Sequence, residues 1–151
     1  MCSAPADSGR AMQQDGRAYR DLVLAAVWQD GMALRYASEE LQADHEIVLA
    51  AVQQDGRALE YASAELKADH EVVLAAVWQT AYALKYASAE LKADREVVLT
   101  AVQKDFEMSL QYDDSALQYA SAEMKADREV VLAALQRNEY AHEYASAEPA
   151  E

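Results

Sequence analysis

The stretch YASAELKADHEVVLAAV occupies residues 61–77, and residues 86–102 repeat it as YASAELKADREVVLTAV with only two changes. A unit of about 25 residues is too short to bury its own apolar face, whereas stacked units can bury one another. The repetition therefore predicts an array of like units, each packed on the next. The tripeptide Tyr-Ala-Ser begins at Tyr36, Tyr61, Tyr86, Tyr119 and Tyr144, at spacings of 25, 25, 33 and 25 residues.

The first half of each unit has the pattern of a buried α-helix. Asp44 precedes one such run as an N-cap, because its carboxylate can accept a hydrogen bond from a free amide of the first turn. The apolar run at residues 47–52 leaves little polar face, so this helix is expected to lie between neighbours. Asp55 and Gly56 follow, and the glycine is expected to end the helix in the left-handed conformation.

The second half of the unit has the spacing of another helix, expected from about residue 57 to residue 67. Leu59, Ala62 and Leu66 stand at positions i, i+3 and i+7, which places them on one stripe of a helix. Each unit is therefore predicted to be a hairpin of two short helices.

The chain as a whole is predicted to be all-α. Its two prolines are Pro5 and Pro149, so the long stretch between them lacks the strongest helix breaker. The segments beside the apolar runs have helical spacing, which argues against strands, and no heptad persists long enough for a coiled coil. We predict a short α-solenoid of about five helical-hairpin repeats with a 25-residue period, one unit being 33 residues long.

The expected domain organisation follows from where the repeats begin and end. Residues 1–19 are expected to form a degenerate N-terminal cap, partly disordered, and residues 20–148 a single helical repeat domain, with residues 149–151 as a tail.

The repeated unit also resembles a known family. Its pattern, DREVVLAAV-x-x-DG-x-AL-x-YASAELKA, is similar to the tandem repeat of domain of unknown function 4116 over roughly residues 22–148. The resemblance implies helical tandem repeats in soluble proteins, and it implies no activity, ligand or catalytic residue. The chain departs from the pattern at residues 79–82, where the Asp-Gly turn is missing, and in the longer fourth unit.

Composition limits the classes of partner. The chain has 13 Lys+Arg against 27 Asp+Glu, a net charge of −14, which disfavours nucleic acid and anionic membranes. The acidic surface either serves solubility or also attracts a basic protein partner. No run is apolar enough for membrane insertion, and the N-terminus lacks the apolar core of a signal peptide. The single cysteine, Cys2, fits an intracellular reducing compartment better than secretion, and the sequence does not identify a compartment.

The 33-residue unit contains the first candidate partner-binding site. Its eight extra residues replace the glycine turn with Phe106, so the first helix is expected to continue to about Tyr112 and to extend roughly 12 Å beyond the stack. Ser115 and Gln118 match a capping box that starts the next helix. An apolar helix end is a docking surface unless it folds back onto the adjacent hairpin. The candidate residues are Phe106, Met108, Leu110 and Tyr112.

Two tryptophans form the second candidate. Trp28 and Trp78 occupy equivalent positions, at which the intervening and following units carry Gln53 and Gln103. A position that accepts glutamine is not deeply buried, so the two indoles are expected on one face, roughly 20 Å apart if units stack at about 10 Å. They are either interface anchors or caps over the core leucines four residues earlier.

No residues predict catalysis, a cofactor or a metal. His45 and His70 share an equivalent position with Arg95 and Arg128, and arginine replaces a solvent-facing cation rather than a metal ligand. His142 has no Cys or second His close to it in the sequence. The carboxylates and tyrosines recur in each unit, unlike a catalytic group, which is normally singular.

Three functions remain open. The first is a non-catalytic protein-interaction or scaffold module that presents an acidic surface, alone or as a subunit of a larger assembly. The second is a structural spacer or a self-associating array, for which a homo-oligomer is expected. The third is a ligand-binding protein or enzyme with a pocket on the concave face.

Overall fold

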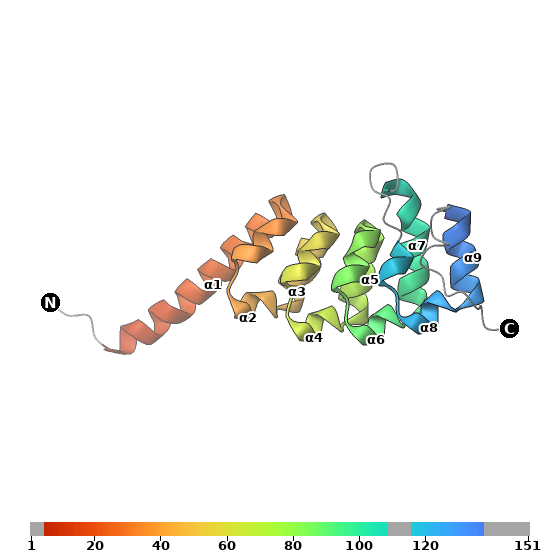
Figure 1. The fold of residues 1–151 in the computed structure, drawn as a ribbon. Helices are drawn as coiled ribbons and strands as arrows, with labels where there is room; N and C mark the ends of the chain where they lie inside the picture. The colour runs from red at the N-terminus through yellow and green to blue at the C-terminus, as the bar shows by residue number, and fades with distance from the viewer. Residues whose placement is uncertain (1–4, 109–115, 138–151) are drawn as a thin grey trace.

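The computed structural model describes residues 5–108 and 116–137, all of it built from helices and turns (Figure 1). Five long helices are α1 (Pro5–Gln29), α3 (His45–Gln54), α5 (His70–Gln79), α7 (Arg95–Met108) and α9 (Arg128–Arg137). Between them run the 3-10 helices η1 (Gly31–Tyr36), η2 (Gly56–Tyr61), η3 (Ala81–Tyr86) and η4 (Ala116–Tyr119), and the short α-helices α2 (Glu39–Gln42), α4 (Ala64–Lys67), α6 (Ala89–Lys92) and α8 (Ala122–Lys125). The predicted all-α repeat fold is confirmed.

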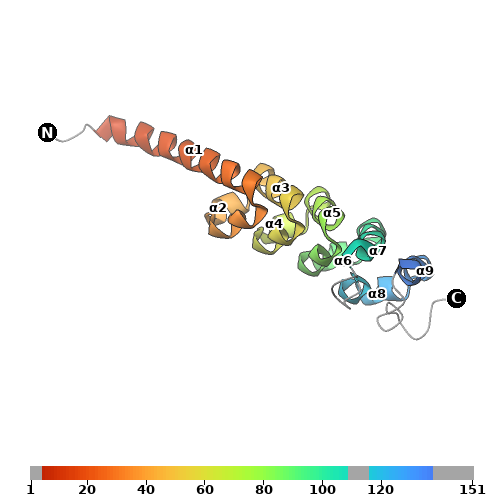
Figure 2. The ribbon, with the colours of Figure 1, turned by 90° about the horizontal axis from the view of Figure 1, so that it is seen from above.

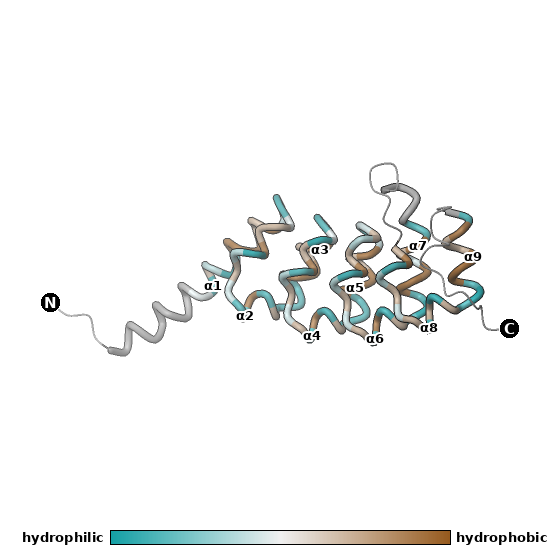
Figure 3. The backbone as a smooth tube through the Cα atoms, in the orientation of Figure 1, coloured by the Kyte–Doolittle hydropathy of each residue, from teal (hydrophilic) through white to brown (hydrophobic). Residues whose placement is uncertain are grey.

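The units follow one another in a row of two layers. The long helices lie side by side in one layer, and the short helices form a second row beside them (Figure 2). Helix α1 is longer than its counterparts and continues through residue 19, where we expected a boundary between cap and repeat domain. The most hydrophobic stretches lie on the long helices, and hydrophilic stretches recur at the ends of these helices (Figure 3).

The helix predicted at residues 57–67 is not continuous. It is divided into η2 and α4, because Ala62 adopts an extended conformation with φ −72° and ψ 156°. Ser63 then caps α4, its hydroxyl accepting a hydrogen bond from the Leu66 amide at 3.3 Å. Serine competes in this way with a continuing helix. Leu59, Ala62 and Leu66 are nevertheless all buried, so the predicted apolar stripe is right and the predicted continuity is wrong.

The recurring serine also joins one unit to the next. The Ser63 amide donates a hydrogen bond to the Gln42 carbonyl of the preceding short helix, at 2.9 Å. Ser88 and Ser121 make the equivalent bonds, each also 2.9 Å long. Because the same serine caps its own helix and bonds to the neighbouring unit, the stacking geometry explains why the serine of Tyr-Ala-Ser recurs.

The expectation that Gly56 ends the helix in the left-handed conformation is wrong, since none of the described glycines has a positive φ. Gly56 is instead the first residue of η2, where it approaches the next unit closely. A Cβ placed on Gly56 would lie 2.3 Å from the carbonyl oxygen of Ala76 in α5, and Gly31 faces Ala51 at the same distance. The glycine therefore provides room between units. The third unit carries Ala81 at this position and packs against α7, so the close approach is not identical in all units.

The core runs between the two layers along the stack. The N-caps form as predicted: the Asp44 carboxylate accepts a hydrogen bond from the Ile47 amide at 3.2 Å, which starts α3. Behind each cap, the long helix buries its apolar run against the neighbouring units. The 3-10 helices add one leucine per unit, and none of these side chains is exposed to solvent: Leu34, Leu59, Leu84 and Leu117.

Candidate functional site

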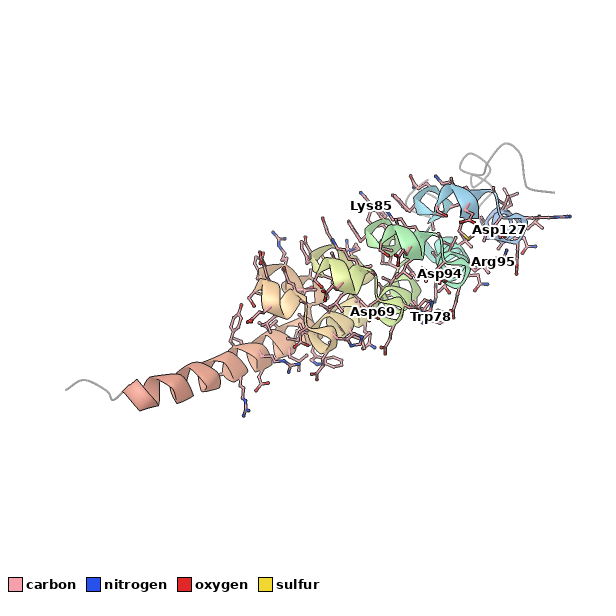
Figure 4. The ribbon with its side chains drawn as sticks, turned by 90° about the horizontal axis from the view of Figure 1, so that it is seen from below. Asp69, Trp78, Lys85, Asp94, Arg95 and Asp127 are labelled. Carbon is pink, nitrogen blue, oxygen red and sulfur yellow. The ribbon has the colours of Figure 1, made fainter. Side chains whose placement is uncertain are left out.

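A row of cations and carboxylates runs from Arg20 within α1 along the N-terminal ends of α3, α5, α7 and α9. In each pair, one unit provides the cation and the next unit provides its N-cap aspartate and first-turn glutamate. Figure 4 shows Asp69, Asp94 and Asp127 of successive units along this side. The groups, which we call the charge row, are Arg20 with Asp44 and Glu46, His45 with Asp69 and Glu71, His70 with Asp94 and Glu96, and Arg95 with Asp127 and Glu129.

The charge row is more than the solvated edge that the sequence suggests. The side chains of His45 and His70 are each 44% exposed, and each imidazole reaches across to carboxylates of the next unit. Arg20 donates to both acids facing it, with Nε 3.1 Å from Asp44 Oδ2 and Nη2 2.6 Å from Glu46 Oε2. The row therefore links neighbouring units through side chains, in addition to the backbone hydrogen bonds that join the short helices of neighbouring units.

At the two ends of the charge row, hydrogen bonds from Arg20 and Arg95 lower the pKa of the aspartates that they contact. Hydrogen bonding from Arg95 holds the pKa of the Asp127 carboxyl below its ordinary value, against a smaller opposing effect of burial. For Asp44, burial alone would raise the pKa, but hydrogen bonds from Arg20 and the Ile47 amide outweigh it and lower the pKa. Both shifts mean that the ionised carboxylate stabilises the stack.

Acid is expected to weaken the contact between the last two described units. A lowered folded-state pKa contributes stability above the unfolded carboxyl value of about 4 and loses it as the pH falls through the folded value. Asp127→Asn keeps an N-cap but removes the charge. We expect the variant to have a lower Tm than the wild type at pH 7, and the difference to shrink towards pH 3. Thermal unfolding followed by circular dichroism checks this, and a difference that is constant with pH would contradict it.

A shallow groove lies on the same side of the molecule, over α3, α5 and α7. Its volume is about 540 Å³, and Trp78 lines it together with Leu74 one turn earlier. Glu71 and Glu96 lie along the groove and are well exposed. Lys104 of α7 stacks on the indole, with Nζ 4.2 Å from the ring centroid. The groove thus combines an aromatic wall with a mainly acidic rim; its remaining lining residues are Gln53, Ala75, Gln79 and Thr100.

Both tryptophans are exposed, Trp78 by 63% and Trp28 by 54%. The side chains of their glutamine counterparts, Gln53 and Gln103, are exposed as well, which agrees with the sequence argument that this position is not buried. Trp78 also contacts α7 through Lys104, so it stabilises the stack while leaving most of its surface free.

The long fourth unit is described in part. Helix α7 continues past the point at which α3 and α5 end, as the missing glycine predicts, and reaches Met108. The side chains of Phe106 and Met108, together with residues 109–115, which include Leu110, Tyr112 and the predicted cap Ser115, lie outside the described residues. The docking surface expected from these residues stays a prediction.

An aromatic cluster on the short-helix side was not found by the sequence analysis. The ring of Tyr82 meets Tyr86 and Tyr119 edge-to-face at centroid distances of 5.8 and 5.6 Å, and its hydroxyl accepts a hydrogen bond from Lys85 at 3.1 Å. Burial raises the pKa of the Tyr86 hydroxyl, and the hydrogen bond with Tyr82 adds to the shift. In the sequence, Tyr82 itself could have pointed to this cluster, because it stands at residues 79–82, where the Asp-Gly turn of the repeat is missing.

The clusters of the charge row, unlike the Tyr82 cluster, repeat from unit to unit. A second hollow of about 470 Å³ is lined by Arg95, Asp127, Arg128, Glu129 and Leu132, most of them part of the charge row. The ligand atoms of His45, Asp69 and Glu71 lie within 4.8 Å of one another, as do those of His70, Asp94 and Glu96. These two groups are the described clusters with donor types suited to a metal ion.

Comparisons with known proteins identify the repeat. A family model described as a domain of unknown function (DUF4116) matches residues 19–67, 69–112 and 105–148. No curated protein and no solved structure matches the chain. Among the described residues, no helix has the length and apolar character needed to span a bilayer.

Proposed function

Since the chain belongs to the DUF4116 family, whose description assigns no function, we propose a function from its own surface: a non-catalytic protein-interaction module. In this proposal, a Lys/Arg-rich segment of another protein lies in the groove beside Trp78. The observation that carries it is the exposed indole of Trp78 in an apolar groove with an acidic rim.

The chemistry of the groove supports this partner. Tryptophan is among the residues that contribute most to binding energy at interfaces, and its ring also attracts cations. Lys104 already occupies one side of the Trp78 ring, an arrangement that a lysine or arginine of a partner can repeat on the open side. The net charge of −14 attracts a basic segment from a distance.

Trp28 extends the proposed surface by two units. At about 10 Å per unit, the two indoles are separated by roughly 20 Å. An extended peptide covers this distance with about six residues. A basic segment with two apolar anchors, about six residues apart, is therefore the expected ligand.

A peptide-display selection tests the proposal. A random library is selected on three immobilised proteins: the intact chain, Trp28→Gln/Trp78→Gln, and a chain lacking residues 106–113. Glutamine is the matched replacement because the fold already carries it at Gln53 and Gln103. We expect the intact chain and the deletion to enrich Lys/Arg-rich peptides, and the double variant to lose them.

The other outcomes distinguish the alternatives. Loss of enrichment in the deletion alone would place binding on the fourth-unit insertion instead of the groove. The same enrichment on all three proteins would exclude both surfaces, and no enrichment on any of them would favour a structural spacer.

A further inference from the structure

We propose that the two histidine groups of the charge row are equivalent sites for a divalent transition-metal ion such as Zn²⁺. One site is His45, Asp69 and Glu71, and the other is His70, Asp94 and Glu96. Each site lies between two units, because the histidine belongs to one long helix, and the aspartate and glutamate stand just before and in the first turn of the next. A metal ion there would join neighbouring units.

The distances are compatible with metal ligands. His45 Nε2 lies 3.3 Å from Glu71 Oε2 and 3.8 Å from Asp69 Oδ2, and His70 repeats this with 3.1 and 3.8 Å to Glu96 and Asp94. Metal–ligand bonds of about 2.0–2.1 Å at tetrahedral angles place ligand atoms about 3.3 Å apart. A separation of 3.8 Å is too long for a hydrogen bond, but a small rotation of the side chain brings it to that value.

The arginines of the same row provide independent evidence that this position takes a cation. In the flanking units, the guanidinium of Arg20 or Arg95 lies between the aspartate and the glutamate that correspond to the proposed ligands. Histidine lacks the permanent positive charge of a guanidinium, so a bound metal ion would supply the charge that faces the two carboxylates of each histidine site. Arginine at the equivalent position of other units therefore does not argue against a metal site, since arginine and a histidine-bound metal ion fulfil the same electrostatic role.

The N-caps orient the carboxylates. Asp69 Oδ1 accepts a hydrogen bond from the Val72 amide at 3.1 Å, which leaves Oδ2 directed towards His45. Asp94 is held in the same way by the Val97 amide, also at 3.1 Å. Such support of a ligand by a second group typically improves metal affinity. The partial exposure of both histidines lets water complete the coordination.

Isothermal titration of the full chain with Zn²⁺ tests the proposal. The matched variant is His45→Arg/His70→Arg, which introduces the residue that neighbouring units carry and preserves the ion pair. We expect the wild type to bind two more Zn²⁺ per chain than the double variant, and each single variant to bind one more. The comparison between proteins removes any contribution of Cys2 or His142.

A second measurement addresses folding of the variants. Zn²⁺ is expected to raise the Tm of the wild type and not that of the double arginine variant, because a ligand that binds the folded state stabilises it. If the arginine variant fails to fold by circular dichroism, His45→Gln/His70→Gln replaces it. Equal Zn²⁺ stoichiometry and equal Tm shifts in wild type and variant would show an adventitious ion only and overturn the proposal.

Discussion

Replacing Gly56 with valine is expected to destabilise the fold by about 3 kcal/mol, an overpacking cost at the upper end of the usual range. The new Cβ would lie 2.3 Å from the carbonyl oxygen of Ala76 and 2.6 Å from Cγ2 of Thr80. The carbonyl belongs to the backbone of α5, so relief requires the second and third units to separate. Urea unfolding followed by circular dichroism measures the loss.

Gly16 provides the matched control. It lies inside α1, and nothing would come within 4 Å of a Cβ placed there. Gly16→Ala is therefore expected to stabilise the chain by about 0.5–1 kcal/mol, the usual gain for alanine over glycine in a helix. Wild-type stability of Gly56→Val would contradict the close packing between units.

Leu59→Ala is the second substitution with a large expected effect. Leu59 is fully buried between the two layers, so truncation removes apolar contacts and leaves a cavity. The expected loss is about 2–5 kcal/mol. The midpoint of urea unfolding, with an unchanged slope, is the quantity to compare.

Leu22→Ala is the control for this substitution. The Leu22 side chain is 67% exposed in α1, so its truncation is expected to change the free energy of unfolding by less than about 0.5 kcal/mol. Equal effects of the two substitutions would mean that the layer interface is not the core of the array.

Local patterns predict much of the fold. The spacing of Tyr-Ala-Ser indicates the units, because the tripeptide recurs along the chain, and Asp44 marks the start of α3, because an N-cap depends on neighbouring residues alone. The break at Ser63 escapes the same reasoning because the apolar stripe of Leu59, Ala62 and Leu66 stays intact across it. A periodic pattern records which side chains are buried, not whether the backbone between them is helical.

Contacts between units are the part that sequence reasoning misses. Gly56 looks like a helix terminator, and only the position of the next helix shows that it makes room for Ala76. The charge row had a signal in the sequence, because Arg20 precedes His45 by 25 residues and Glu71 follows His45 by 26. Recognising it requires knowing that equivalent positions of adjacent units face each other.

Of the properties of the candidate groove, the sequence predicts only the exposure of its tryptophan. The alternation of tryptophan and glutamine indicates an exposed position, and Trp28 and Trp78 are exposed. That Trp78 shares a groove with Glu71 and Glu96 depends on the packing of α5 against α7, which no single unit encodes.

The dissociation constant of a selected Lys/Arg-rich peptide, measured for the intact chain and for Trp78→Gln, tests the proposed docking surface most directly. Fluorescence anisotropy at low and high salt gives both the affinity and its electrostatic share. We predict at least tenfold weaker binding by the variant, about 1.4 kcal/mol, and weaker binding by both proteins at high salt. Equal affinity of the two proteins would contradict a groove built around Trp78.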